Sequence, residues 1–163
     1  MDKNLNIEFV WKNVSDGLKK SAVKFWLAEG AIQKEEDALK RAEDLVAVCK
    51  LNDEIVGVAT GIKTVYPPLH NHFVVYRTYV GKEHRQKGIA RQIFHHTYDS
   101  FNQNDNQEVI GFLCALENAS LNENTKAVWA KDRNLNFMGF DNRGIQIRVA
   151  FFENAEVKMP VKK

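Results

Sequence analysis

The stretch that decides the fold is Val80-Gly-Lys-Glu-His-Arg-Gln-Lys-Gly-Ile-Ala90, which joins an expected strand, Phe73–Val80, to a helical pattern over Arg91–Phe101. It contains three cations, and Gly88 stands where the helix would begin. Free backbone N–H groups and the positive end of the helix dipole bind anions at a helix N-terminus. Glycine lets a phosphate approach the backbone without meeting a side chain. The stretch therefore predicts a pyrophosphate cradle between a strand and a helix.

The composition is that of an ordinary globular protein. The chain has 163 residues, of which 44% are hydrophobic and 27% charged, and its net charge is +2. This predicts one domain over residues 1–163 and gives no basic field for nucleic acid. No apolar run approaches the roughly 18 residues of a membrane span, and the N-terminus lacks a signal-peptide core. We expect a cytoplasmic protein without a membrane or nucleic-acid partner.

The cysteines and histidines do not form a pattern typical of a metal site. Cys49 and Cys114 lie within strand-like runs, which predicts buried thiols in a reducing compartment. His95 and His96 lie mid-helix with no Cys or His at ligand spacing, and His70-Asn71-His72 fits a loop turn better than a metal pair. The sequence predicts no metal.

The first half of the chain alternates between strand and helix patterns. A strand is expected over Ile7–Trp11, a helix over Asp16–Glu29 between an N-cap at Ser15 and a stop at Gly30, a helix over about Lys34–Leu45, and strands over Val46–Leu51 and Glu54–Ile62. The two-residue turn Asn52-Asp53 makes the last two strands a hairpin.

The second half contains the parallel part of the sheet. Val109–Leu116 is almost continuously apolar, which is typical of a strand buried on both faces, as in a parallel pair with Phe73–Val80. The helix between these strands is then a right-handed crossover. A short helix near Asn124–Asn134 and a last strand, Ile145–Phe152, follow.

These elements define an α/β (α+β) fold. We expect a mixed, mostly antiparallel sheet of six to seven strands, with one parallel pair formed by the fourth and fifth strands and about four flanking helices. The binding site should lie at the carboxyl ends of the two parallel strands.

Two common phosphate cradles do not fit. A Walker P-loop requires Gly-x-x-x-x-Gly-Lys-Ser/Thr, whereas Gly81 and Gly88 have another spacing and no Lys-Ser/Thr pair follows. A dinucleotide fold requires Gly-x-Gly-x-x-Gly, of which the chain offers Gly88 alone.

The hexapeptide Arg85-Gln86-Lys87-Gly88-Ile89-Ala90 fits a third pattern, Gln/Arg-x-x-Gly-x-Gly/Ala. In this it resembles the GNAT superfamily, the acetyl-CoA-dependent N-acetyltransferases. The two early helices, the hairpin at Asn52-Asp53 and the late Gly139-Phe140 pair also resemble that family. The resemblance covers nearly the whole chain in element order, and it implies acetyl-CoA as the co-substrate.

The resemblance also implies roles for particular residues. The backbone N–H groups of Arg85, Gln86, Lys87, Gly88, Ile89 and Ala90 would bind the CoA pyrophosphate, with added charge from Lys87 and Arg91. The backbone of Tyr79 and Val80 would pair with the pantetheine arm, and an N–H near Val80 would polarise the thioester carbonyl. Asn124, three residues before Ala127, resembles the family's Asn-x-x-Ala and would hold the pantetheine amide. Asn118 is the competing candidate for that contact.

The proton-transfer groups depart from the family pattern. A tyrosine about four residues before the Gly-Phe pair often protonates the leaving thiolate, and here that position is Leu135. The general acid therefore stays open. For the general base, Glu117 follows the fifth strand, and His72 precedes the fourth. We expect Glu117 or His72 to act, directly or through water.

Two functions remain open. The first is transfer of an acetyl group from acetyl-CoA to a primary amine of a small-molecule or peptide acceptor, by a monomer or homodimer. The alternative is a CoA-binding sensor or interaction module that has lost the chemistry, as the missing tyrosine suggests. The near-neutral charge disfavours a nucleic-acid-binding domain. The sequence does not identify the acceptor.

Overall fold

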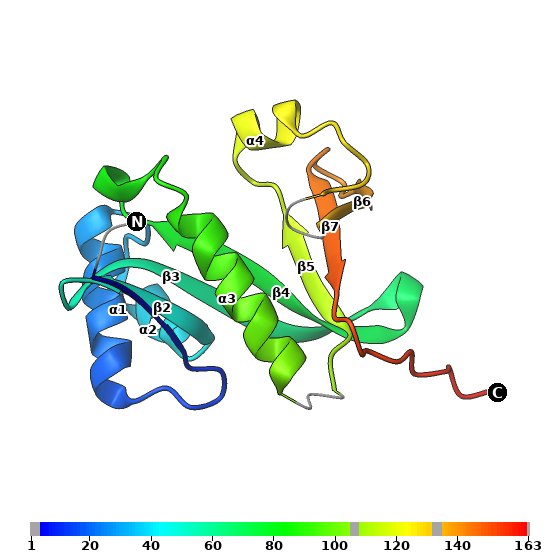
Figure 1. Ribbon diagram of the computed structural model, residues 1–163, viewed down its shortest axis with the longest axis horizontal. Helices are drawn as coiled ribbons and strands as arrows, with labels where there is room; N and C mark the ends of the chain where they lie inside the picture. The colour runs from blue at the N-terminus through cyan, green and yellow to red at the C-terminus, as the bar shows by residue number, and fades with distance from the viewer. Residues whose placement is uncertain (1–3, 105–107, 132–134, 163) are drawn as a thin grey trace. The chain divides into compact units, whose positions relative to one another are not determined.

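The computed structural model describes residues 4–104, 108–131 and 135–162 (Figure 1). Its elements are β1 (Leu5–Phe9), α1 (Asp16–Glu29), α2 (Glu35–Ala42), β2 (Leu45–Leu51), β3 (Glu54–Tyr66), β4 (Asn71–Val80), α3 (Ile89–Gln103), β5 (Gly111–Ala115), α4 (Ala119–Asn124), β6 (Asn136–Phe140) and β7 (Gln146–Phe151). The sheet order is β1-β2-β3-β4-β5-β7-β6, and β4 and β5 are parallel. The expected mixed α/β sheet with one parallel pair is confirmed.

The chain forms two compact units. The first unit holds the chain up to Gly61 together with Thr78–Ser100, and the second holds Ile62–Arg77 together with the chain from Phe101 onward. The expectation of a single domain over residues 1–163 stays a prediction.

Helix α1 begins and ends where the sequence predicts. The Ser15 side chain accepts a hydrogen bond from the backbone N–H of Leu18 at 3.2 Å, and Gly30 ends the helix in the left-handed conformation at φ 66°. These contacts satisfy backbone groups that a helix end leaves without partners.

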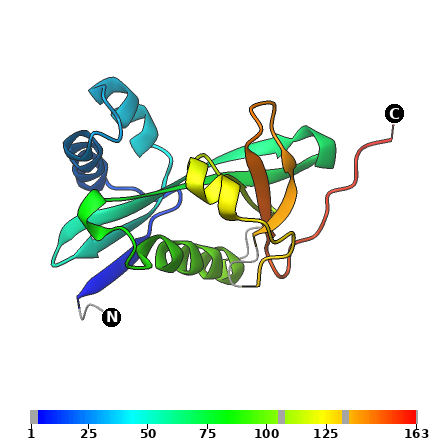
Figure 2. The ribbon, with the colours of Figure 1, turned by 90° about the horizontal axis from the view of Figure 1, so that it is seen from above.

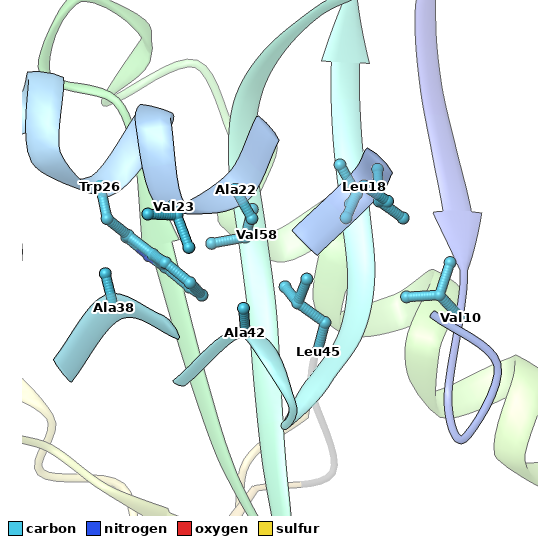
Figure 3. Packing of buried hydrophobic residues seen from close by; sticks show 10 residues of the cluster. Val10, Leu18, Ala22, Val23, Trp26, Ala38, Ala42, Leu45 and Val58 are labelled. Atoms are coloured by element: carbon cyan, nitrogen blue, oxygen red, sulfur yellow. The ribbon is translucent and has the colours of Figure 1, made fainter. Parts of the chain in front are cut away.

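The core of the first unit lies between the helices and the sheet. Figure 3 shows Trp26 of α1 packed beside Ala38 of α2 and near Val58 of β3. Helices α1 and α2 cover one face of these strands, and the part of α3 in this unit lies on the other face (Figure 2). The buried residues of the two helices form a stripe at helical spacing: Leu18, Ala22, Val23 and Trp26 in α1, and Ala38 and Ala42 in α2.

The hairpin and the thiols also agree with the sequence. Asn52 and Asp53 have φ values of 50° and 67°, the left-handed pair that a two-residue turn between antiparallel strands favours. Cys49 and Cys114 are buried and unoxidised. Burial raises the pKa of the Cys49 thiol to about 11 and that of Cys114 to about 12.

In the second unit, aromatic rings fill one face of the sheet. Phe101 stacks on Phe152 at 5.2 Å, and both meet Phe112 edge-on. A second cluster contains Phe73 and Leu113. Strand β6, which pairs with β7, was not expected as a separate strand.

One expected helix is wrong. The sequence predicted it near Asn124–Asn134, but α4 spans Ala119–Asn124 and the chain from Thr125 to Lys131 is not helical. The remaining residues of that prediction, 132–134, lie outside the described residues. Several strand ends also shift: the first strand is Leu5–Phe9, and Leu45 belongs to β2 rather than to α2. Among the described residues, no helix is long and apolar enough to cross a membrane.

We predict that Gly111→Ala destabilises the protein. A Cβ at Gly111 would clash with the Ala150 carbonyl oxygen and lie 3.0 Å from the Cα of Phe151, both backbone atoms of the neighbouring strand. Such overpacking costs about 1–3 kcal/mol of the free energy of unfolding, measured by urea titration. The matched control is Gly17→Ala in α1, where a Cβ meets no atom within 4 Å. Equal stability of the two variants would contradict the prediction.

Candidate functional site

The first two residues of the stretch between β4 and α3 are hydrogen-bonded to other parts of the first unit. The backbone N–H of Gly81 donates to the Val56 carbonyl at 2.9 Å, and the N–H of Lys82 donates to Glu29 Oε2 at 2.9 Å. A 3₁₀ turn, Lys82–His84, follows. The role of Glu29, the last residue of α1, has no local signal in the sequence because the contact spans 53 residues.

The Arg85 side chain turns back onto β4. Its Nε donates to the Val80 carbonyl at 3.1 Å, and its guanidinium lies 5.3 Å from the centre of the Tyr79 ring. Tyr79 in turn contacts Phe25 edge-on at 5.9 Å. Arg85 therefore stabilises the loop through its side chain, a role that the hexapeptide alone did not predict.

Two left-handed residues shape the cradle. Gln86 has φ 63° and Gly88 has φ 75°, whereas Lys87 between them is not left-handed. Alternation of this kind turns successive N–H groups to one side and forms an anion-binding concavity. All three residues are exposed, and within the described chain their backbone N–H groups donate to no protein acceptor.

Space and charge in the cradle also suit an anion. A Cβ added at Gly88 would meet no atom within 4 Å, so the backbone there is open to approach. Helix α3 starts at once with Ile89, and the N–H of Gln92 donates to the Gly88 carbonyl at 3.0 Å. The side chains of Lys82, Lys87 and Arg91 are exposed cations around this helix start.

The parallel ladder beside the site is short. β4 and β5 pair at Val74–Phe112 and Val75–Leu113, and in the described chain no further pair continues this register. β5 continues to Ala115 through its pairing with β7.

In the second unit, Glu117 lies between two guanidinium groups. Its Oε1 accepts from Arg77 Nη2 at 3.2 Å, and Arg143 Nη2 lies 3.8 Å from the same oxygen. Arg143 also binds Asp141 Oδ2, through Nε at 3.0 Å and Nη2 at 2.7 Å. Neither arginine was predicted from the sequence, because their positions carry no motif.

The Asp141–Arg143 pair shifts both pKa values. Burial raises the pKa of the Asp141 carboxyl, but hydrogen bonds from Arg143 and from the Ile145 backbone outweigh this and lower it overall. The hydrogen bond to Asp141 raises the pKa of the Arg143 guanidinium. The two side chains remain oppositely charged at neutral pH.

The two candidate asparagines occupy the two ends of α4. Asn118 is its N-cap, and its Oδ1 accepts from the backbone N–H of Leu121 at 3.0 Å. Asn124 is the last residue of the helix, and its amide donates to the Ser120 carbonyl at 2.8 Å. Asn118, rather than Asn124, therefore stands at the start of the helix after the fifth strand.

His72 and Glu117 lie at different ends of their strands. His72 is the second residue of β4, where its carbonyl accepts from the Ile110 N–H at 2.9 Å. It precedes Val80 by eight residues, a rise of roughly 26 Å along a strand. Glu117 follows the carboxyl end of β5. Glu117 thus lies after the carboxyl end of its strand and His72 near the amino end of its own, and the catalytic role of each stays a prediction.

The segment after α4 is held by a buried arginine. Arg148 of β7 is 3% exposed. Its guanidinium donates to the carbonyls of Thr125, Ala127 and Leu135 and to Gln146 Oε1, at distances from 2.7 to 3.3 Å. Among the described residues it forms no ion pair, and burial lowers its pKa. The carbonyl of Leu135, the position of the family's usual tyrosine, is thus fixed to β7.

In the part of the chain that the structure describes, no three His, Cys, Asp or Glu side chains group as metal ligands.

Sequence and structure comparisons identify the family. A family model described as the Acetyltransferase (GNAT) family matches residues 11–131. The chain therefore belongs to this family of acetyltransferases. A search of curated proteins found no match.

Solved structures of acetyltransferases share the fold. An N-acetyltransferase from Staphylococcus aureus Mu50 has a TM-score of 0.60 at 14% identity, over 91% of this chain and 97% of that chain. The ribosomal-protein-S18-alanine N-acetyltransferase from Escherichia coli has a TM-score of 0.55 at 12% identity, over 98% of this chain and 99% of that chain. N-acetylglutamate synthase from Neisseria gonorrhoeae, solved with coenzyme A and L-arginine, has a TM-score of 0.60 at 11% identity, over 93% of this chain and 34% of that chain.

We predict that Arg148→Met lowers the free energy of unfolding by about 2–4 kcal/mol, because the buried Gln146 Oε1 and the part-buried carbonyls of Ala127 and Leu135 lose their donor. Urea titration measures the change. Lys126→Met is the control: Lys126 is exposed in the same unit, and such a change stays within about 0.5 kcal/mol. A similar small effect at Arg148 would show that the network does not hold the segment.

Proposed function

We propose that this protein transfers an acetyl group from acetyl-CoA to a primary amine. The observation that carries the proposal is the exposed cradle of Gln86, Lys87 and Gly88 at the junction of β4 and α3, in a chain of the acetyltransferase family. Open N–H groups, left-handed backbone and neighbouring cations together suit a pyrophosphate. The solved relative with bound coenzyme A supports the same donor.

Each part of the donor has candidate partners in the chain. The N–H groups from Arg85 to Ala90 bind the pyrophosphate, and Lys87 and Arg91 add positive charge. The backbone of Tyr79 and Val80, at the end of β4, pairs with the pantetheine arm. Asn118 is our first choice for the pantetheine amide, because it starts α4, and Asn124 is the second.

The reaction requires a free amine. The amine nitrogen forms the new C–N bond as the C–S bond breaks, and the products are the amide and the CoA thiol. An ammonium acceptor must first lose a proton. We assign this step to Glu117, which follows the carboxyl end of β5 and acts directly or through water. We prefer it to His72, which lies near the start of β4.

The alternative function is a CoA-binding module without turnover. Leu135 in place of the family's usual tyrosine favours it. Both functions predict CoA binding, and release of free CoA in the presence of an amine separates them. The decisive experiment is a thiol-release assay with acetyl-CoA over small amines, amino acids and peptides.

We predict that Gly88→Ala weakens acetyl-CoA binding at least about tenfold, as measured by calorimetry, because the new methyl group occupies the space open to the phosphate. Gly30→Ala is a matched control. Gly30 is also left-handed, at φ 66°, has equally open surroundings and lies in the same unit. Both variants carry the same kind of backbone strain, so a difference in acetyl-CoA affinity between them shows that Gly88 lies in the binding site. Equal affinity in the two variants would show that the cradle does not bind the phosphates.

We predict that Glu117→Gln lowers kcat/KM for the best amine roughly 10²- to 10⁴-fold, the usual contribution of a general base. The affinity for acetyl-CoA should stay within about twofold, since the amide keeps the shape of the carboxylate. Glu123→Gln on α4 serves as the control, because Glu123 is exposed and forms no contact with the arginines. Unchanged kcat/KM in Glu117→Gln would show that another group acts as the general base.

A further inference from the structure

Four charged side chains of the second unit meet at one place. They are Arg77 of β4, Glu117 after β5, and Asp141 and Arg143 of the turn between β6 and β7. Their formal charges cancel. The stability of the fold does not depend on these contacts, because each exposed ion pair contributes only about 0–1 kcal/mol.

Within this cluster the carboxylate of Asp141 has all its hydrogen bonds within its own turn. Asp141 Oδ2 accepts two bonds from the Arg143 side chain, and Oδ1 accepts the backbone N–H groups of Arg143 and Ile145 at 2.8 and 3.0 Å. Both carboxylate oxygens are thus engaged. This pair fixes the turn and leaves little capacity for a ligand.

The Arg77–Glu117 pair, by comparison, leaves several hydrogen-bonding groups unused. Arg77 uses one of its five N–H donors, Nη2, on Glu117 Oε1, and within the described chain Glu117 Oε2 accepts no hydrogen bond. The two side chains are 49% and 44% exposed. The pair therefore offers spare donors and a spare acceptor side by side, and it is weak enough to rearrange around a ligand.

We propose that Arg77 and Glu117 select an acceptor that carries a carboxylate beside its amine, as an amino acid does. This rests on the proposed function. Arg77 takes the carboxylate through its planar fork, and Glu117 faces the ammonium from which it removes the proton. An amine without a carboxylate would leave Arg77 paired with Glu117 and the base occupied.

The charge change of the reaction suits product release. Acetylation removes the positive charge of the acceptor. The product then keeps its contact with Arg77 but loses the one with Glu117, which favours its release.

The test compares amino acids with their amides, which keep the amine and lose the negative charge. For the wild type we expect kcat/KM for the acid to exceed that for its amide at least tenfold. In Arg77→Gln this ratio should fall towards one, because the acid loses its contact with the guanidinium and the amide no longer finds Glu117 paired with Arg77. Arg77→Lys, which keeps the charge without the fork, should lie between them. Lys63→Gln, which breaks the exposed pair with Glu108 in the same unit, should leave the ratio unchanged.

Two results would overturn the inference: a ratio near one in the wild type, or a ratio that Arg77→Gln leaves unchanged while its Tm is preserved. If no amine releases CoA, the proposed transfer fails separately. Calorimetry on the CoA-saturated protein then decides about the cluster. Tighter binding of acids than amides, lost in Arg77→Gln, would support a carboxylate site, and equal binding would refute it.

Discussion

The parallel pairing of β4 with β5 is the constraint on which the rest of the structure depends. Two parallel strands require a crossover between them, and here α3 provides it. The chain between β4 and α3 must change direction over residues 81–88, and Gln86 and Gly88 contribute left-handed backbone to this turn. The same exposed residues form the proposed cradle.

The short extent of this pairing has a second consequence. After two residue pairs β5 keeps only its antiparallel partner, β7. The chain beyond β5 is therefore free to bend, and it turns into α4 with Asn118 as the cap and Glu117 just before it. The candidate groups at the end of β5 and the cradle after β4 thus follow from one feature of the sheet.

Local patterns predicted most of the fold because local contacts determine those parts. The stripe of α1, its cap at Ser15 and its stop at Gly30 act within a few residues, and so does the Asn52-Asp53 turn. The parallel pair was also predictable, because a strand buried on both faces must be apolar throughout. The cradle predicted from Gly88 and its surrounding charges stays a prediction.

The parts that the sequence did not predict depend on contacts between distant residues. Residues 125–130 include good helix formers such as Lys126 and Ala127, so a helix was expected there. The Arg148 guanidinium instead binds the carbonyls of Thr125 and Ala127, groups that a helix would use internally. A hydrogen-bonding residue more than 20 positions away in the sequence therefore outweighs the local helix propensity. The same holds for Arg77 and Arg143 around Glu117, whose meeting depends on three separate elements.

The missing tyrosine bears differently on the two proton transfers of the proposed reaction. A thiol with a pKa near 8.5 is a fair leaving group at neutral pH, because its anion is only modestly basic. An amine of the lysine type, with a pKa near 10.4, is almost wholly protonated there and cannot attack. Loss of the acid at Leu135 therefore costs less than loss of the base would. Under the proposed function, a chain that lacks the tyrosine but has Glu117 beside Arg77 fits an enzyme better than a sensor, because a sensor needs no carboxylate at that place.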